Sequence, residues 1–117
     1  MERLLMLEKS VDQAIVRWAR EKWPEMIIRK LSTLGARGTN GDPDRLFFWK
    51  GKLILIEMKR PGGLCTDLQL QRHIEWQRAG AKVIVVDSVV AGRQVLDQEF
   101  NNTRRRPKTW RTSTLHS

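Results

Sequence analysis

Two acidic residues and a lysine lie at the start of one apolar run of this chain and at the end of the next. Asp44 directly precedes the run 45–49, and Glu57 and Lys59 fall at the end of the run 53–58. Carboxylate oxygens are the ligands that hard divalent cations such as Mg²⁺ prefer. A lysine ammonium beside them can orient or deprotonate a water or stabilise charge on a phosphate. The combination predicts metal-assisted hydrolysis of a phosphodiester, provided that the fold brings the three side chains together.

A β-hairpin is the element that brings them together. Lys50 and Gly51 lie between the two runs, and glycine supplies the positive φ that a tight two-residue loop requires. With this loop, antiparallel pairing places Asp44 opposite Glu57, and Lys59 shares the face of Glu57 because side chains alternate along a strand. Like charges on opposed residues destabilise a sheet unless a cation neutralises them. A loop of three or four residues would shift this register and change which residues share a face.

A long helix is expected before the hairpin. Residues 3–22 carry an apolar stripe with the helical period, which predicts an amphipathic helix that ends before Pro24. Glu8 falls within the arc of that stripe, so its carboxylate is predicted to point toward the core. A buried carboxylate is costly unless it is paired or bound to a metal. Glu8 therefore either pairs with a basic residue, lies at the margin of the stripe beside Asp12, or belongs to the site.

The remaining elements alternate between strands and helices, which favours an α/β fold with a mixed sheet flanked by helices. They are a strand at 26–31, a loop at 32–43, the hairpin, a helix opened by Thr66 that runs to about Ala79, a strand at 82–87 and a helix at 91–100. The expected core order is α-β-β-β-α-β, with a helical crossover joining parallel neighbours. The apolar, β-branched run 82–87 is typical of a strand that is buried on both faces. One domain over 1–100 and a basic tail over 101–117 are predicted.

The second predicted helix carries two further candidates, Gln69 and His73. Thr66 and Gln69 have the spacing of a capping box, which by itself explains Gln69. His73 shares its helix face, and the spacing leaves open a catalytic role, packing at the boundary between helix and sheet, or exposure at the edge of the cleft. Cys65 is the single cysteine and has no partner at metal-ligand spacing. An unpaired cysteine suits a reducing compartment such as the cytoplasm.

The charge of the chain predicts a polyanionic partner. Its formal net charge is +9, and lysine or arginine set against phosphates releases condensed counterions. Nucleic acid is favoured over a membrane because the apolar runs are too short to span a bilayer and no signal-peptide pattern opens the chain. Trp110, inside the tail, is a candidate for stacking on bases. The residues expected to contact phosphates are Arg37, Arg45, Arg104, Arg105, Arg106 and Lys108.

Two motifs carry a resemblance to a known group of enzymes. The segments Gly41-Asp42-Pro43-Asp44 and Glu57-Met58-Lys59 resemble the Pro-Asp and (Asp/Glu)-X-Lys signature of the PD-(D/E)XK nuclease superfamily. With Glu8 on the first helix and Gln69 on the second, the chain looks more narrowly like the VRR-NUC family over roughly residues 4–90. The resemblance implies a restriction-endonuclease-like core. Its implied metal ligands are Asp44, Glu57, the Met58 carbonyl and Glu8, with Lys59 and Gln69 in the catalytic set.

The resemblance also implies a function, a metal-dependent endonuclease acting on DNA with Mg²⁺ or, as a substitute, Mn²⁺. Stand-alone members of the family resemble Holliday-junction resolvases, which implies branched DNA as substrate and a homodimer to make two symmetric cuts. The implied setting is the cytoplasm of a bacterium or of a phage-infected cell. Fold-level analogy does not fix the substrate, so a nicking or restriction-like endonuclease on ordinary duplex and a non-catalytic nucleic-acid-binding module stay open.

Overall fold

The structure is a computed structural model that describes residues 2–31 and 41–101. Its elements are α1 (Glu2–Lys22), β1 (Ile27–Lys30), β2 (Arg45–Trp49), β3 (Lys52–Met58), α2 (Asp67–Arg78), β4 (Lys82–Val86) and α3 (Val89–Asn101). This confirms the predicted α-β-β-β-α-β order and the last helix. Arg37 and the tail residues Arg104, Arg105, Arg106, Lys108 and Trp110 lie outside the described residues, so their predicted roles and the predicted boundary at residue 100 stay predictions.

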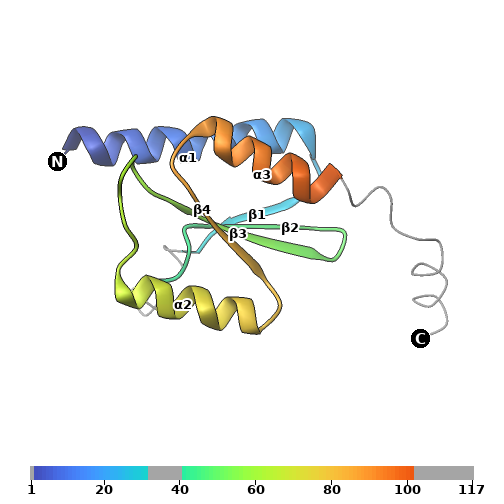
Figure 1. Cartoon of the computed structure of the whole chain (residues 1–117). Coiled ribbons are helices and arrows are strands. Elements are labelled where there is room, and N and C mark those ends of the chain that lie inside the picture. Colours follow the sequence, from blue (N-terminus) through green and yellow to red (C-terminus); the bar gives the residue numbers. More distant parts are fainter. Residues whose placement is uncertain (1, 32–40, 102–117) are drawn as a thin grey trace.

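The four strands form one mixed sheet in the order β1-β2-β3-β4. The pairs β1/β2 and β2/β3 are antiparallel, whereas β3 and β4 are parallel and are joined through α2, as predicted. Helices α1 and α3 cover one face of the sheet and α2 covers the other (Figure 1). None of the helices in the described part of the chain has the length and apolar composition that a bilayer crossing requires.

The hairpin between β2 and β3 has the predicted two-residue loop. Lys50 and Gly51 have φ values of 49° and 80°, and two successive positive φ values are typical of the tight turns that match the twist of paired strands. The register pairs Trp49 with Lys52 and Arg45 with Ile56. Continuing that register by one residue sets Asp44 opposite Glu57. The longer loops that the sequence left open are therefore excluded.

The alternation of side chains along β3 divides its residues between core and site. Ile54, Ile56 and Met58 are buried in the main apolar cluster, together with residues of α1 and α3 such as Ile15 and Leu96. Leu55 and Glu57 are also buried but belong to the opposite face, which α2 covers. The core therefore holds β3 rigidly on one side while Glu57 projects from the other.

The prediction that the strand at 82–87 is buried on both faces is wrong. β4 is an edge strand of the sheet, its first residue Lys82 is exposed, and Val85 is 46% exposed. Val85 pairs with Glu57 and so lies on the same face of the sheet as α2. Because Val85 is exposed, α2 does not cover this outer part of the sheet. An apolar, β-branched run has the same composition in a central strand and in an edge strand that packs on one side only.

Candidate metal-binding site

Asp44 is held at the end of the hairpin by both its backbone and its side chain. Its carbonyl oxygen accepts a hydrogen bond of 2.9 Å from the backbone N–H of Leu31, which extends the pairing of β1 with β2. Its Oδ2 accepts one of 2.7 Å from the backbone N–H of Met58. The carboxylate of Asp44 is thereby fixed against β3 at the residue that follows Glu57.

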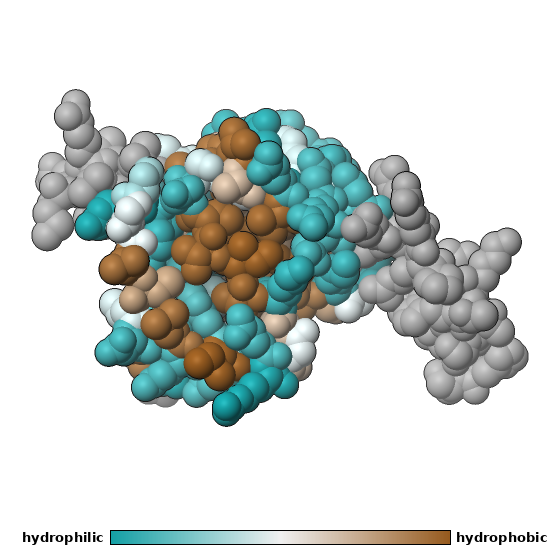
Figure 2. Space-filling view, in the orientation of Figure 1, coloured by the Kyte–Doolittle hydropathy of each residue, from teal (hydrophilic) through white to brown (hydrophobic). Residues whose placement is uncertain are grey.

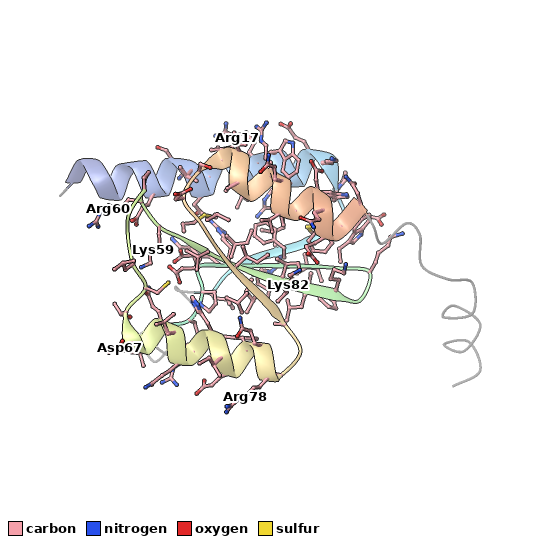
Figure 3. The ribbon with its side chains drawn as sticks, in the orientation of Figure 1. Arg17, Lys59, Arg60, Asp67, Arg78 and Lys82 are labelled. Carbon is pink, nitrogen blue, oxygen red and sulfur yellow. The ribbon has the colours of Figure 1, made fainter. Side chains whose placement is uncertain are left out.

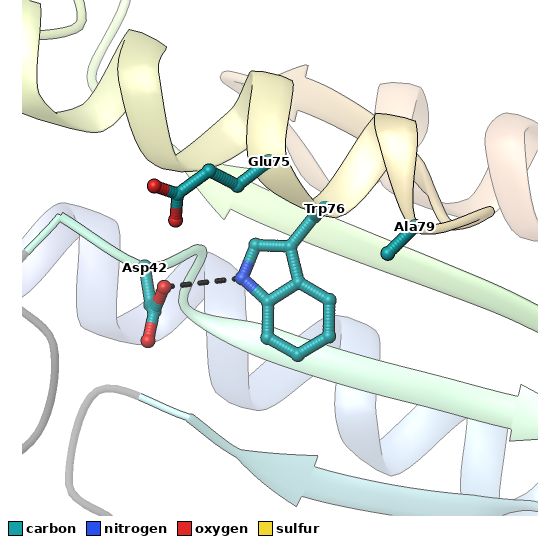
Figure 4. A pocket seen from close by; sticks show the side chains of 4 residues that line it. All are labelled: Asp42, Glu75, Trp76 and Ala79. Atoms are coloured by element: carbon teal, nitrogen blue, oxygen red, sulfur yellow. Dashed lines mark hydrogen bonds between the residues drawn. The ribbon is translucent and has the colours of Figure 1, made fainter.

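The turn that carries Asp44 packs against α2. Gly41 has a φ of +89°, and a Cβ there would lie 3.0 Å from the backbone oxygen of Leu68. Glycine therefore allows both the backbone conformation and the close approach. Asp42 accepts a 3.1 Å hydrogen bond from Nε1 of Trp76. The cavity between turn and helix is lined by Asp42, Glu75, Trp76 and Ala79 (Figure 4).

Glu57 is a buried acid that faces other acids. Only 2% of the residue is exposed. Burial first, then the negative charge of Asp44 and a hydrogen bond between the two carboxyl groups, raise the pKa of Glu57 from 4.5 to about 8, with Glu8 adding to the shift and Lys59 opposing it. At neutral pH the pair therefore carries less negative charge than two ordinary carboxylates. A divalent cation bound here would supply positive charge to both acids.

Lys59 supplies the nearest positive charge. Its Nζ lies 4.0 Å from Oε2 of Glu57, and its side chain is 18% exposed. The backbone N–H of Lys59 donates to the carbonyl of Val86 at 2.9 Å, so β3 stays paired with β4 beyond Met58. The structure thus brings Lys59 close to the acid pair, as the strand pattern predicted. In Figure 3, Lys59 and Arg60 lie at one end of the sheet, between α1 and α2.

Glu8 lies near the acid pair, but its carboxylate is hydrogen-bonded to the backbone. Its Oε1 accepts a 3.0 Å hydrogen bond from the N–H of Arg60, so it anchors the chain where it leaves β3. Among the described residues, no group of three His, Cys, Asp or Glu side chains is arranged to hold a metal ion. Mg²⁺ is commonly held by one or two carboxylates, with waters and substrate phosphates completing its shell. The donor set of Asp44 and Glu57 fits that cation.

Gln69 has the structural role that its spacing predicted. Its backbone N–H donates to Oγ1 of Thr66 at 3.1 Å, and its side-chain Oε1 accepts from the backbone N–H of Thr66 at 2.8 Å. These two bonds form the capping box at the start of α2. Helix capping by itself explains why a glutamine is found at position 69, and its place in the catalytic set stays a prediction.

Two residues approach the acid pair more closely than the sequence indicated. His73 is buried, with Nε2 3.6 Å from Oε1 of Glu57; burial, followed by the charge of Lys59, lowers its pKa, and Asp44 opposes this shift. Burial raises the pKa of the Cys65 thiol, and the charge of Glu57 raises it further. Both positions depend on how the segment after β3 folds back over the sheet, for which the sequence carries no local signal.

Arg45 is paired within the protein. Its Nε and Nη2 donate to the two carboxylate oxygens of Asp12 at 2.8 and 2.9 Å. The two side chains are 15% and 14% exposed, so this bidentate pair is largely shielded and ties β2 to α1. A phosphate contact by Arg45, as predicted, would have to share a guanidinium that Asp12 already binds.

Comparisons with known proteins show similarity to nucleases in sequence and in fold. No family model matches the sequence. A segment of 52 residues is 44% identical to "Putative nuclease p44" of Acyrthosiphon pisum secondary endosymbiont phage 1, and the match covers 44% of this chain and 56%, little more than half, of the phage protein. A solved structure described as "VRR_NUC domain" superposes with a TM-score of 0.60 and 26% identity, over 80% of this chain and 97% of the other.

Proposed function

We propose that the chain is a nuclease of the VRR-NUC family, to whose solved domain it is similar, and that it is a metal-dependent endonuclease that hydrolyses phosphodiester bonds in DNA. The observation that carries the proposal is the buried acid pair. Glu57 is almost fully buried opposite Asp44, and its pKa is raised to about 8. A protein that keeps two carboxylates together in this way gives up stability, which is typical of sites where a cation or a reaction needs them.

The proposed cofactor is Mg²⁺, for which Mn²⁺ can substitute. Asp44 and Glu57 would supply carboxylate oxygens and Met58 its backbone carbonyl, with Glu8 as a candidate for a second ion. When bound, a divalent cation neutralises charge on the phosphate and makes water more acidic. The hydrogen bond from the Met58 N–H to Asp44 fixes one carboxylate in place before any cation arrives. Such preorganisation reduces the reorganisation needed at the moment of reaction.

Lys59 is the proposed catalytic ammonium. Its Nζ, 4.0 Å from Oε2 of Glu57, lies beside the place where a phosphate would approach the acid pair. There it can orient the attacking water, help to remove its proton, or stabilise negative charge on the phosphate. Glu8 holds the backbone of Arg60, the residue after Lys59, and so helps to fix the position of this strand end.

The proposed substrate is branched DNA. The net charge of +9 supports binding to phosphates without reading of base sequence. A four-way junction is cut at two symmetric places, which a two-fold dimer can reach at the same time. The basic residues proposed to contact phosphates are Arg37, Arg45, Arg104, Arg105, Arg106 and Lys108.

A gel assay that compares four-way junctions, flaps and linear duplex in Mg²⁺ tests this substrate. We expect the junction to be cut fastest and EDTA to stop all cutting. Equal cutting of junctions and linear duplex would contradict the branched substrate and favour a nicking or restriction-like endonuclease. Binding of all three DNAs without cleavage in either Mg²⁺ or Mn²⁺ would contradict an enzymatic role and favour a binding module.

An exposed apolar surface supports the proposed homodimer. Figure 2 shows apolar side chains gathered over β4, with more of them along α2 below it. The exposed members include Val85 on the edge strand and Leu70 and Ile74 on α2, which are 46%, 48% and 46% exposed. Edge strands and contiguous apolar patches are the surfaces through which copies of a chain associate. We propose that a second copy covers this surface.

The Val85→Lys variant tests the dimer. Burying a lysine at the proposed interface is costly, so the variant should be monomeric where the wild-type protein is dimeric. Ile27→Lys is the matched control, because Ile27 is 44% exposed on β1, at the opposite edge of the sheet. Light scattering coupled to size-exclusion chromatography measures the mass of each. A monomeric wild-type protein, or a dimeric Val85→Lys protein, would contradict the interface.

A further inference from the structure

His73 is a buried histidine for which the proposed reaction has no use. It lies on α2, four residues after Gln69, and only 6% of the residue is exposed. Its Nε2 lies 3.6 Å from Oε1 of Glu57. In the described part of the chain, neither of these two buried atoms has a hydrogen-bond partner.

Two unpaired buried polar atoms that face each other need an explanation. Each has given up water without gaining a partner, which costs stability. Their separation is slightly longer than the range of about 2.7–3.2 Å for N–H···O hydrogen bonds, so a small side-chain shift closes the gap. An aliphatic side chain would fill the space under α2 without this cost. Packing alone therefore does not explain a ring nitrogen at this position.

We infer that His73 is a positioning residue that orients the Glu57 carboxylate toward the divalent cation, an inference that rests on the proposed function. With a cation at the acid pair, a small side-chain shift would let Nε2–H donate to Oε1, which would fix the rotation of the carboxylate about its last bond. The other oxygen, Oε2, lies on the side of Lys59. Carboxylates that hold metals are themselves commonly held by hydrogen bonds, which orient them and tighten metal binding.

A second contact from the same helix supports this role. Trp76, one turn after His73, donates its Nε1–H to Asp42, which lies in the turn that carries Asp44. Residues three apart on a helix share a face. One face of α2 thus approaches Glu57 of β3 through His73. The same face contacts the turn of Asp44 through the hydrogen bond from Trp76 to Asp42 (Figure 4). The helix holds the two proposed metal ligands relative to each other.

Calorimetric titration with Mn²⁺ of the wild-type, His73→Leu and His73→Gln proteins tests the inference. Leucine fills the space without a donor, whereas the glutamine amide places an N–H close to the position of Nε2. We expect His73→Leu to weaken Mn²⁺ binding about tenfold or more, and His73→Gln to recover most of that loss. In EDTA, the thermal midpoint of His73→Leu should equal or exceed that of the wild type, because an unpaired buried nitrogen is gone. If the leucine variant does not fold, His73→Phe replaces it.

Other outcomes separate this inference from the proposed function. A lower thermal midpoint of His73→Leu with unchanged Mn²⁺ affinity would show a merely structural role and overturn the inference. Equal loss of affinity in the leucine and glutamine variants would overturn it as well, because the donor would then not matter. If wild-type protein binds Mn²⁺ and His73→Leu binds it equally, the inference alone fails. If the wild type binds none, the proposed metal site fails and the inference fails with it.

Discussion

Replacing Glu57 with glutamine should make the metal-free protein more stable at pH 8 and at the same time remove its binding of Mn²⁺. The pKa of Glu57 is about 8 in the folded protein against an ordinary 4.5. Between these values the folded state holds a proton that the unfolded chain has released, so stability falls as pH rises through this window. One pKa unit corresponds to about 1.4 kcal/mol, so even a partial shift gives the neutral glutamine an advantage of about 2 kcal/mol at pH 8.

Thermal unfolding in EDTA measures this effect. The advantage of Glu57→Gln should be small at a pH well below 4.5, where the wild-type carboxyl is mostly protonated in both states, and should grow toward pH 8. Glu75→Gln is the matched control, because the Glu75 side chain is 62% exposed and its ion pair with Arg72 contributes little. A Glu57→Gln protein that is less stable than the wild type at both pH values, or that still binds Mn²⁺, would contradict this account of the site.

Wild-type binding of Mn²⁺ should strengthen with pH for the same reason. A cation must displace the proton of Glu57, so the apparent affinity should rise about tenfold per pH unit up to about pH 8 and then level off.

Replacing Lys59 with methionine should stop cleavage while leaving metal binding intact. Methionine keeps most of the apolar length of the side chain and removes the ammonium that lies 4.0 Å from Glu57. Groups that move protons or stabilise charge in a transition state contribute about 10²–10⁴-fold to rates, and we expect a loss in that range. Binding of Mn²⁺ should persist, because the two carboxylates remain and a nearby positive charge is gone.

Single-turnover cleavage at saturating enzyme separates this loss from weakened DNA binding. Arg60→Met is the matched control, since it removes one positive charge from the next residue, which is exposed. That protein should cleave close to the wild-type rate. Equal losses in the two variants would mean that Lys59 acts only through the overall charge, and an undiminished rate in Lys59→Met would remove it from the catalytic site.

The hairpin shows which part of this fold could be predicted from the sequence. Its register depends on Gly51, on the two-residue loop and on the alternation of side chains, all of which are local, so the pairing of Asp44 with Glu57 was predictable. The burial of β4 was not, because the composition of a strand does not say whether a neighbour covers its outer edge. No neighbour covers the outer edge of β4 in the described part of the chain, so Val85 is exposed beside the buried Glu57.

The contacts that complete the site depend on packing between distant elements. The proximity of His73 to Glu57 and of Trp76 to Asp42 requires a particular rotation of α2 over the sheet. The pairing of Arg45 with Asp12 requires α1 to cross the start of β2. Helical spacing placed Gln69 and His73 on one face, but it could not say which of them faces Glu57. The structure gives that position to His73 and uses Gln69 as a cap.

Asp44 and Glu57 are the proposed metal site for cutting DNA. Cleavage of an end-labelled four-way junction in Mg²⁺ by the wild-type and Asp44→Asn proteins tests it most directly. The amide oxygen of asparagine can still accept the hydrogen bond from Met58, so the hairpin end should keep its structure. We predict that the wild type cuts the junction, and that Asp44→Asn folds and binds the junction but does not cut it. Cleavage by Asp44→Asn at the wild-type rate would contradict the claim.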